Sequence, residues 1–114
     1  MPDQPFYKRV LLKISGESFS SPGAFGIDAN ELKTIAEEIV SAAQSGTQIA
    51  VVVGGGNMIR GADLSKRIEI DQSTADYMGM LGTIMNGMAL KEAIETCGHA
   101  ARVMSAIDVP AIAE

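Results

Sequence analysis

Residues 54–61 (GGGNMIRG) of this 114-residue chain have the composition of an anion-binding loop. Three consecutive glycines follow an apolar stretch, and because they have no Cβ, several backbone N–H groups can converge on a phosphate. Arg60 would add a fork of charged donors that matches phosphate oxygens. The same glycines could instead form a tight strand–helix turn that binds nothing. We favour phosphate binding, because one or two glycines are enough for a turn.

This loop matches neither of the two common glycine-rich phosphate motifs. The dinucleotide motif G-x-G-x-x-G, begun at Gly54, requires glycine or alanine where this chain has Ile59. The Walker motif G-x-x-x-x-G-K-[ST] fits Gly56 and Gly61, but alanine and aspartate follow in place of its lysine and hydroxyl residue. The loop therefore predicts phosphate binding outside the Rossmann and P-loop classes.

A second candidate site is the segment Lys13-Ile14-Ser15-Gly16. Lys13 follows three apolar residues, so its ammonium group either reaches solvent beside the strand or serves a group at the end of the strand. Gly16 allows a ligand to approach closely. Both interpretations of Lys13, an exposed lysine and a phosphate contact, stay open at this point.

Asp76 is a third candidate. Ser73 and Asp76 have the spacing of a capping box, in which the two side chains bond to backbone N–H groups at the start of a helix. A carboxylate at this position could also accept hydrogen bonds from ribose hydroxyls. The spacing alone favours the helix cap.

The apolar pattern predicts the elements that must position these residues. Apolar runs predict three strands, at 8–14, 48–53 and 101–107, and the first two are typical of strands buried on both faces. Helical spacing predicts two helices, from 28 to a stop at Gly46 and from 74 to about 96 with a stop at Gly98. The order β-α-β-α-β predicts one α/β unit with a parallel sheet and right-handed crossovers.

The predicted second helix is rich in methionine and contains three glycines. Each glycine inside a helix costs ~1 kcal/mol relative to alanine. We therefore expect this helix to pack closely against the sheet or against a second subunit.

Composition excludes several other functions. Nine Lys and Arg against 14 Asp and Glu give a net charge of −5, which argues against binding DNA or RNA. Cys97 is the only cysteine and His99 the only histidine, so neither an internal disulfide nor a Cys/His zinc site is expected. The N-terminus has no secretory signal, and the longest apolar run, 49–53, is far shorter than the ~20 residues of a membrane helix. These features predict a soluble, cytoplasmic protein without a metal site of its own.

Five segments in this order, KRVLLKISGES, FGID, VVVGGGNMIRG, DYMGMLGTIMNGMAL and RVMSAI, closely resemble the bacterial uridylate kinases of the amino acid kinase superfamily. The pair K-x-S-G and G-G-G-N is shared across the superfamily, whereas D-Y-M-G-M-L and M-S-A-I are much more specific to the uridylate branch. The resemblance implies a three-layer αβα fold with helices on both faces of a parallel sheet. It also implies phosphoryl transfer from ATP, with Mg²⁺, to UMP, giving UDP and ADP in pyrimidine nucleotide biosynthesis.

The resemblance assigns roles residue by residue. The implied ATP contacts are Lys13, Ser15, Gly16, Gly56 and Arg60, of which Lys13 and Arg60 are the catalytic residues. The implied UMP contacts are Gly55 and Asp76, which reverses the preference for a helix cap at Asp76. A region linked with GTP activation in some members corresponds to Ser21, Gly23, Phe25 and Gly26. The family also implies inhibition by UTP and a homohexamer, with the glycine- and methionine-rich helix as the dimer face.

Members of this family are roughly twice as long as the present chain. We therefore expect residues 1–114 to be the N-terminal, UMP-binding part of a single domain, inactive without the C-terminal, ATP-binding half. Two alternatives stay open. The chain could belong to a superfamily member that phosphorylates a carboxylate such as glutamate, acetylglutamate or aspartate, or it could be a non-catalytic module for nucleotide binding or dimerisation.

Overall fold

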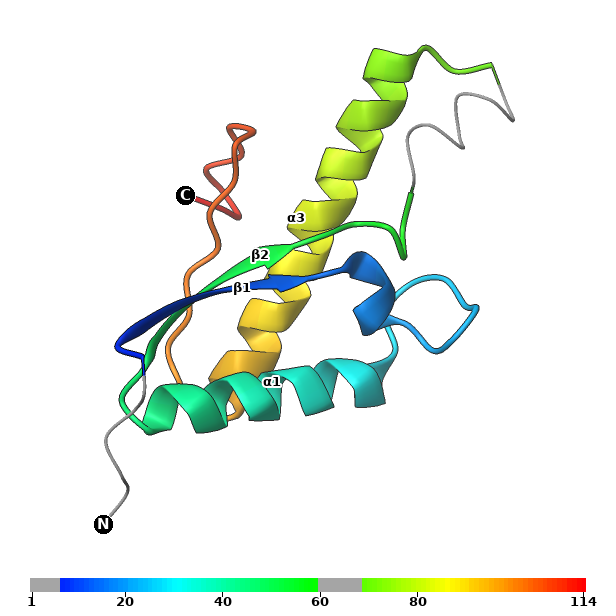
Figure 1. Cartoon of the computed structure of the whole chain (residues 1–114). Helices are drawn as coiled ribbons and strands as arrows, with labels where there is room; N and C mark the ends of the chain where they lie inside the picture. The colour runs from blue at the N-terminus through cyan, green and yellow to red at the C-terminus, as the bar shows by residue number, and fades with distance from the viewer. Residues whose placement is uncertain (1–6, 60–68) are drawn as a thin grey trace.

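A computed structural model describes residues 7–59 and 69–114 of the chain (Figure 1). The elements follow in the order β1 (Arg9–Ile14), a short 3₁₀ helix η1 (Gly16–Phe19), α1 (Ala29–Gln44), β2 (Gln48–Val53) and α3 (Gln72–Thr96). None of the helices within the described residues is both long and apolar enough to cross a membrane.

Strands β1 and β2 pair in parallel, with Arg9 opposite Gln48 and Ile14 opposite Val53. Helix α1 makes the crossover between them, as Figure 1 shows. The predicted α/β class, the first two strands and their parallel arrangement are thus confirmed. Gly54 continues the ladder for one residue, because its N–H donates to the carbonyl of Ile14 at 2.9 Å.

Helix α1 starts and stops where its sequence signals predict. The side chain of Asp28 accepts hydrogen bonds from the backbone N–H groups of Asn30 and Glu31, both at 3.0 Å, and so caps the helix. The bond from Glu31 and a second from the Ser21 hydroxyl hold the pKa of Asp28 below its ordinary value. At the other end Gly46 has φ 106°, a left-handed conformation that glycine adopts without strain.

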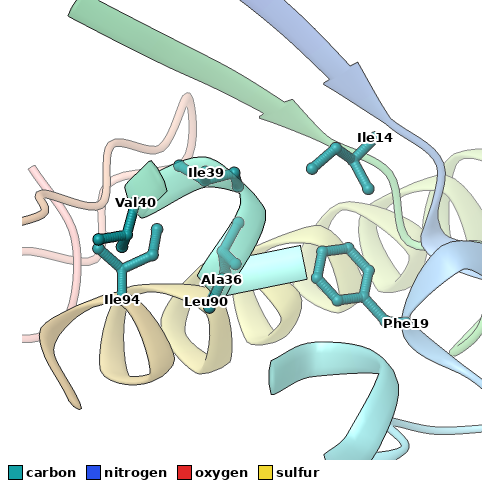
Figure 2. Close-up of a cluster of buried hydrophobic side chains, with 7 residues drawn as sticks. All are labelled: Ile14, Phe19, Ala36, Ile39, Val40, Leu90 and Ile94. Atoms are coloured by element: carbon teal, nitrogen blue, oxygen red, sulfur yellow. The ribbon is translucent and has the colours of Figure 1, made fainter. Parts of the chain in front are cut away.

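The core lies between one face of the two strands and both helices. Figure 2 shows seven buried side chains that meet there: Ile14, Phe19, Ala36, Ile39, Val40, Leu90 and Ile94. Ile49, Val51 and Val53 of β2 pack against this cluster from the sheet. Helices α1 and α3 therefore share one face of the described sheet and also contact each other.

The expectation that both strands are buried on both faces is wrong. On the face away from the helices, Leu11 is 71% exposed and Val52 is 50% exposed, whereas Ile14 on the core face is 9% exposed. Strand side chains alternate between faces, and no described element covers the second face. We call this surface, formed by residues 9, 11, 13, 48, 50 and 52, the open sheet face.

The predicted start of α3 is also wrong by two residues. The helix begins at Gln72 with Asp71 at its N-cap, and the Ser73 hydroxyl donates to Asp71 at 2.8 Å instead of taking part in a capping box with Asp76. The helix ends as predicted, because Gly98 follows the C-cap with φ 89°.

The third predicted strand, 101–107, is not formed. Its side chains alternate between half-buried and exposed, as the sequence pattern indicates, but its backbone joins neither β1 nor β2. Instead the N–H of Ser105 donates to the carbonyl of Glu114, and the N–H of Glu114 donates to the carbonyl of Val103, both at 2.9 Å. The Arg102 guanidinium and the Glu114 carboxylate add an ion pair. Backbone groups of Val103 and Ser105 thus form their hydrogen bonds with Glu114, later in the chain, and not with a neighbouring strand.

Candidate functional site

The predicted loop residues converge at the carboxyl ends of β1 and β2. The segment after β1 (Ser15, Gly16) and the segment after β2 (residues 54–56) lie side by side, because their strands are hydrogen-bonded neighbours (Figure 1). In open α/β sheets, ligands bind at this edge. The structure thus brings together five of the predicted nucleotide contacts: Lys13, Ser15, Gly16, Gly55 and Gly56.

Close packing of the two segments requires glycine. A Cβ on Gly16 would overlap the backbone nitrogen of Gly56, and a Cβ on Gly54 would lie 2.9 Å from the nitrogen of Gly16. None of the glycines at 54–56 has a positive φ. The absence of a side chain therefore serves close approach rather than an unusual backbone conformation.

The glycine loop also rests directly on α3. A Cβ on Gly55 would lie 2.9 Å from the carbonyl oxygen of Gly79 and 3.0 Å from the nitrogen of Thr83. A Cβ on Gly82 would lie 3.1 Å from the Cβ of Met58. Close packing of this helix is present at Gly82, but the partner is the loop that follows β2, not the strands of the sheet or a second subunit as predicted.

The loop continues as a turn within the described residues. The N–H groups of Met58 and Ile59 donate to the carbonyl of Gly55, at 2.9 and 3.1 Å. Residues 56–59 form a turn and not the first turn of a described helix, so the described residues supply no helix N-terminus at this loop. The groups of the loop that would attract an anion are its backbone N–H groups. Arg60, the predicted cationic partner, lies outside the described residues.

Lys13 and Ser15 are exposed at the end of β1. Lys13 lies at the edge of the open sheet face, opposite Val52. Within residues 7–59 and 69–114 it takes part in none of the ion pairs. The Ser15 hydroxyl lies 3.2 Å from the Ser18 hydroxyl of η1. Both groups are therefore accessible to a ligand at the strand ends.

Asp76 is exposed on the second turn of α3, where its carboxylate accepts a hydrogen bond from the Gln72 side chain at 2.8 Å. It lies three residues, ~4.5 Å along the helix axis, before Gly79, which touches Gly55. Because α3 begins at Gln72, the capping-box interpretation of Asp76 is excluded. The carboxylate is free of a role in the helix cap and lies on the helix that supports the glycine loop.

The four residues of the predicted GTP region form a loop between η1 and α1. Gly23 and Gly26 have φ 75° and 81°, and the Phe25 side chain is 87% exposed. The Ser21 hydroxyl donates to Asp28 at 2.9 Å. Gly26 is tied to the glycine loop, because its N–H donates to the carbonyl of Asn57 at 2.9 Å.

Two site residues were missed by reasoning from the sequence. Asn57, which was noted only as the end of a glycine run, and Asn86 of α3 form a fully buried amide pair beneath the glycine loop. The available signal was Asn86 itself, a polar residue with poor helix propensity between apolar neighbours. Within the described residues, no group of three His, Cys, Asp or Glu side chains is arranged to hold a metal ion.

The sequence of the chain is similar to those of known proteins along its whole length. The model of the amino acid kinase family matches residues 8–111. The uridylate kinase of Bifidobacterium longum is 53% identical over all 114 residues, which cover 46% of its own length. That of Clavibacter michiganensis is 51% identical over the whole chain, which covers 47% of its length. The chain thus spans about half the length of the curated relatives it matches.

Solved structures agree with the sequence comparison. The crystal structure of the UMP kinase of Bacillus anthracis superposes with a TM-score of 0.88 at 38% identity, over 95% of this chain and 44% of that one. The UMP kinase of Ureaplasma parvum gives a TM-score of 0.86 at 32% identity, over 95% and 45% of the two chains. Fold and sequence agree, and the chain belongs to the amino acid kinase family.

Proposed function

We propose that residues 1–114 are the N-terminal, UMP-binding part of a single kinase domain that transfers the γ-phosphoryl group of ATP to UMP, giving UDP and ADP. The observation that carries the proposal is the backbone-to-backbone contact of Gly16 with Gly56 at the strand ends. The identity of about half of all residues to uridylate kinases supports the choice of UMP as acceptor. Because the relatives are about twice as long, turnover is expected only when the C-terminal half of the domain is also present.

This reaction suits the residue types at the strand ends. The phosphate of UMP has a second pKa near ~6, so at neutral pH it is largely ionised and needs no general base. Catalysis then consists of aligning two polyanions and neutralising charge on the transferred group. Lys13 and the N–H groups near Gly16 and Gly56 supply positive charge without a Ser-His-Asp triad. Arg60 is the second proposed cationic group.

UMP is proposed to bind between the glycine loop and the start of α3. Gly55 would contact the nucleotide through its backbone, and the Asp76 carboxylate would accept hydrogen bonds from the ribose hydroxyls. Gly55 packs on α3 one helical turn from Asp76, which supports a shared ligand. ATP would enter with Mg²⁺ carried on its phosphates, which commonly supply ligands to this ion together with water.

Regulation and assembly extend the proposal. GTP would act through Ser21, Gly23, Phe25 and Gly26, UTP would inhibit, and the whole protein would be a cytoplasmic homohexamer. The exposed apolar stripe of Tyr77, Leu81 and Met85 on α3 supports this helix as the dimer face.

Calorimetry with the 114-residue chain tests the choice of ligand. We expect UMP to bind, whereas glutamate, acetylglutamate and aspartate should give no heat. Asp76→Ala should weaken UMP binding by about tenfold or more, because a charge-assisted hydrogen bond contributes roughly 1.5–3 kcal/mol. Asp108→Ala, which removes an exposed carboxylate elsewhere, is the matched control.

The same titrations separate the alternatives. Binding of a carboxylate substrate in place of UMP would move the protein to another branch of the family. UMP binding by the chain, without turnover even when the C-terminal half of the domain is supplied, would indicate a non-catalytic nucleotide-binding module. A chain that binds neither UMP nor ATP would contradict the proposal.

A further inference from the structure

The buried amide pair formed by Asn57 and Asn86 is saturated with hydrogen bonds. The Asn57 amide nitrogen donates to Asn86 Oδ1 at 3.1 Å and to the carbonyl of Gly26 at 2.8 Å. The Asn86 amide nitrogen donates to Asn57 Oδ1 at 2.6 Å and to the carbonyl of Gly54 at 2.8 Å. All four side-chain N–H donors are thus used. Rotating either amide by 180° would place an oxygen against an oxygen, so the orientation of both is fixed.

This pair joins three segments that are distant in sequence. Asn86 belongs to α3, Gly54 and Asn57 lie at the two ends of the glycine loop proper (residues 54–57), and Gly26 lies in the loop that precedes α1. A further bond from the N–H of Gly26 to the carbonyl of Asn57 closes the same contact. The two ends of the glycine loop are therefore held by one side chain, that of Asn86, directly at Gly54 and through Asn57.

Packing alone does not account for an asparagine at position 86. Asn86 is 0% exposed and Asn57 is 2% exposed. A buried amide is costly unless its bonds are satisfied, and asparagine is a weak helix former. An apolar side chain would fill the space on α3 but would leave the carbonyl of Gly54 without its side-chain donor, and the Asn57 amide would keep only its bond to Gly26. A fully satisfied polar network of this kind rigidifies and specifies one local arrangement.

We propose that Asn86 is a positioning residue, which fixes the glycine loop so that the N–H groups of Gly55 and Gly56 point to the nucleotide phosphate. The inference deepens the proposed function and rests on it for the identity of the ligand. Asn86 acts through Gly54 and Asn57. The loop at residues 20–27 shares the contact through Gly26, so its position and that of the glycine loop are set together.

The test compares three variants of the 114-residue chain. Asn86→Ala removes the amide, and Asn86→Asp keeps its shape but turns an acceptor oxygen toward the carbonyl of Gly54 and Oδ1 of Asn57. Ile94→Val is the control, because it weakens the core from the same helix, two turns from the loop. For each variant, calorimetry gives the affinity for UMP, thermal melting gives the stability, and ¹H–¹⁵N NMR gives the backbone amide shifts of residues 54–56.

Both Asn86 variants should lose about tenfold or more in UMP affinity and should shift the Gly54–Gly56 resonances, while α3 stays helical. Ile94→Val should lower the melting temperature and leave affinity and glycine shifts unchanged. If Asn86→Ala and Ile94→Val lower the melting temperature equally and neither alters the glycine shifts, Asn86 is only a structural residue and the proposal is overturned.

The unmodified chain provides a measurement that needs no variant. The side-chain NH₂ protons of Asn57 and Asn86 should exchange slowly with solvent, and rapid exchange at both would contradict a closed amide pair. The experiment also distinguishes failure of this inference from failure of the proposed UMP-kinase function. In the latter case the unmodified chain does not bind UMP, while the NMR comparison still decides whether Asn86 positions the loop.

Discussion

Among the residues that the structure describes, Lys13 is the cationic side chain at the carboxyl ends of β1 and β2. Its proposed role in phosphoryl transfer can be tested by removing the charge. In this chain joined to the C-terminal half of the Bifidobacterium longum uridylate kinase, Lys13→Ala should lower kcat by ~100-fold, the usual effect of losing one donor to the transition state. The KM for UMP should change far less. Lys33→Ala, on the exposed side of α1, is the control. Unchanged turnover would remove Lys13 from this role.

Gly16 is the residue at which packing and binding are hardest to separate. A Cβ there has no room, because it would overlap the backbone nitrogen of Gly56 and lie 2.8 Å from the Asn57 side chain. Gly16→Ala should therefore destabilise the chain by roughly 1–3 kcal/mol, the range for overpacking a close contact. Urea unfolding measures the loss. Unchanged stability would mean that the two loops separate easily.

At the scale of elements, the glycines of α3 differ in what surrounds them. A Cβ added to Gly87 would lie 3.6 Å from the Val103 side chain, which is an ordinary contact. A Cβ added to Gly82 would lie only 3.1 Å from the Cβ of Met58. Gly87→Ala should raise stability by about 0.5–1 kcal/mol through helix propensity. Gly82→Ala should gain less or lose stability. Thermal melts that rank the two variants in the opposite order would contradict this account of α3.

The Asp28 cap of α1 makes the stability of the folded chain depend on pH. The pKa of Asp28 is lowered in the folded chain, so the cap contributes its full stability above the pKa of the unfolded chain. That contribution is lost as the pH falls through the folded-state pKa. Asp28→Asn keeps an acceptable cap and should flatten the change of melting temperature below pH ~4. An equally steep decline in both proteins would show that other carboxylates dominate.

Local signals predicted the elements that are stabilised locally. Asp28 and Gly46 marked the ends of α1 because capping depends on neighbouring residues. The segment 101–107 had the alternation of a strand, but strand formation depends on a ladder partner, and its backbone bonds to Glu114 instead. The start of α3 was misplaced because Ser73 bonds to the preceding Asp71, a choice that spacing alone does not determine.

Site residues were predictable from the sequence where the residue type itself indicates the role. Glycines that permit close approach and a lysine at a strand end are visible in the sequence. The amide pair was not, because residues 57 and 86 are 29 positions apart and only the fold brings them together. The packing requirement at Gly55 was likewise hidden, because the backbone of α3 that would meet a Cβ there is distant in sequence.

At the scale of the whole molecule, the open sheet face exposes apolar surface. Leu11 and Val52 lie there, next to an edge of β1 that pairs with no strand among residues 7–59 and 69–114, and such surfaces favour association. We expect the isolated chain to associate with increasing concentration and to melt without a sharp monomeric transition. The double variant Leu11→Thr/Val52→Thr should reduce association in light scattering, whereas Met104→Thr, which is exposed elsewhere, should not. A sharp, cooperative melt of a monomer would contradict the expectation.

The parallel register also has a consequence for how the chain folds. Every residue of β1 pairs with the residue 39 positions later, so no contact between the strands is local. Closing such a loop costs entropy before any pairing is gained. Helix α1 supplies 16 residues of the intervening sequence and can form from neighbouring residues alone, which brings the two strands closer together. We therefore expect α1 to act as a folding template, so that weakening its cap slows refolding more than it speeds unfolding.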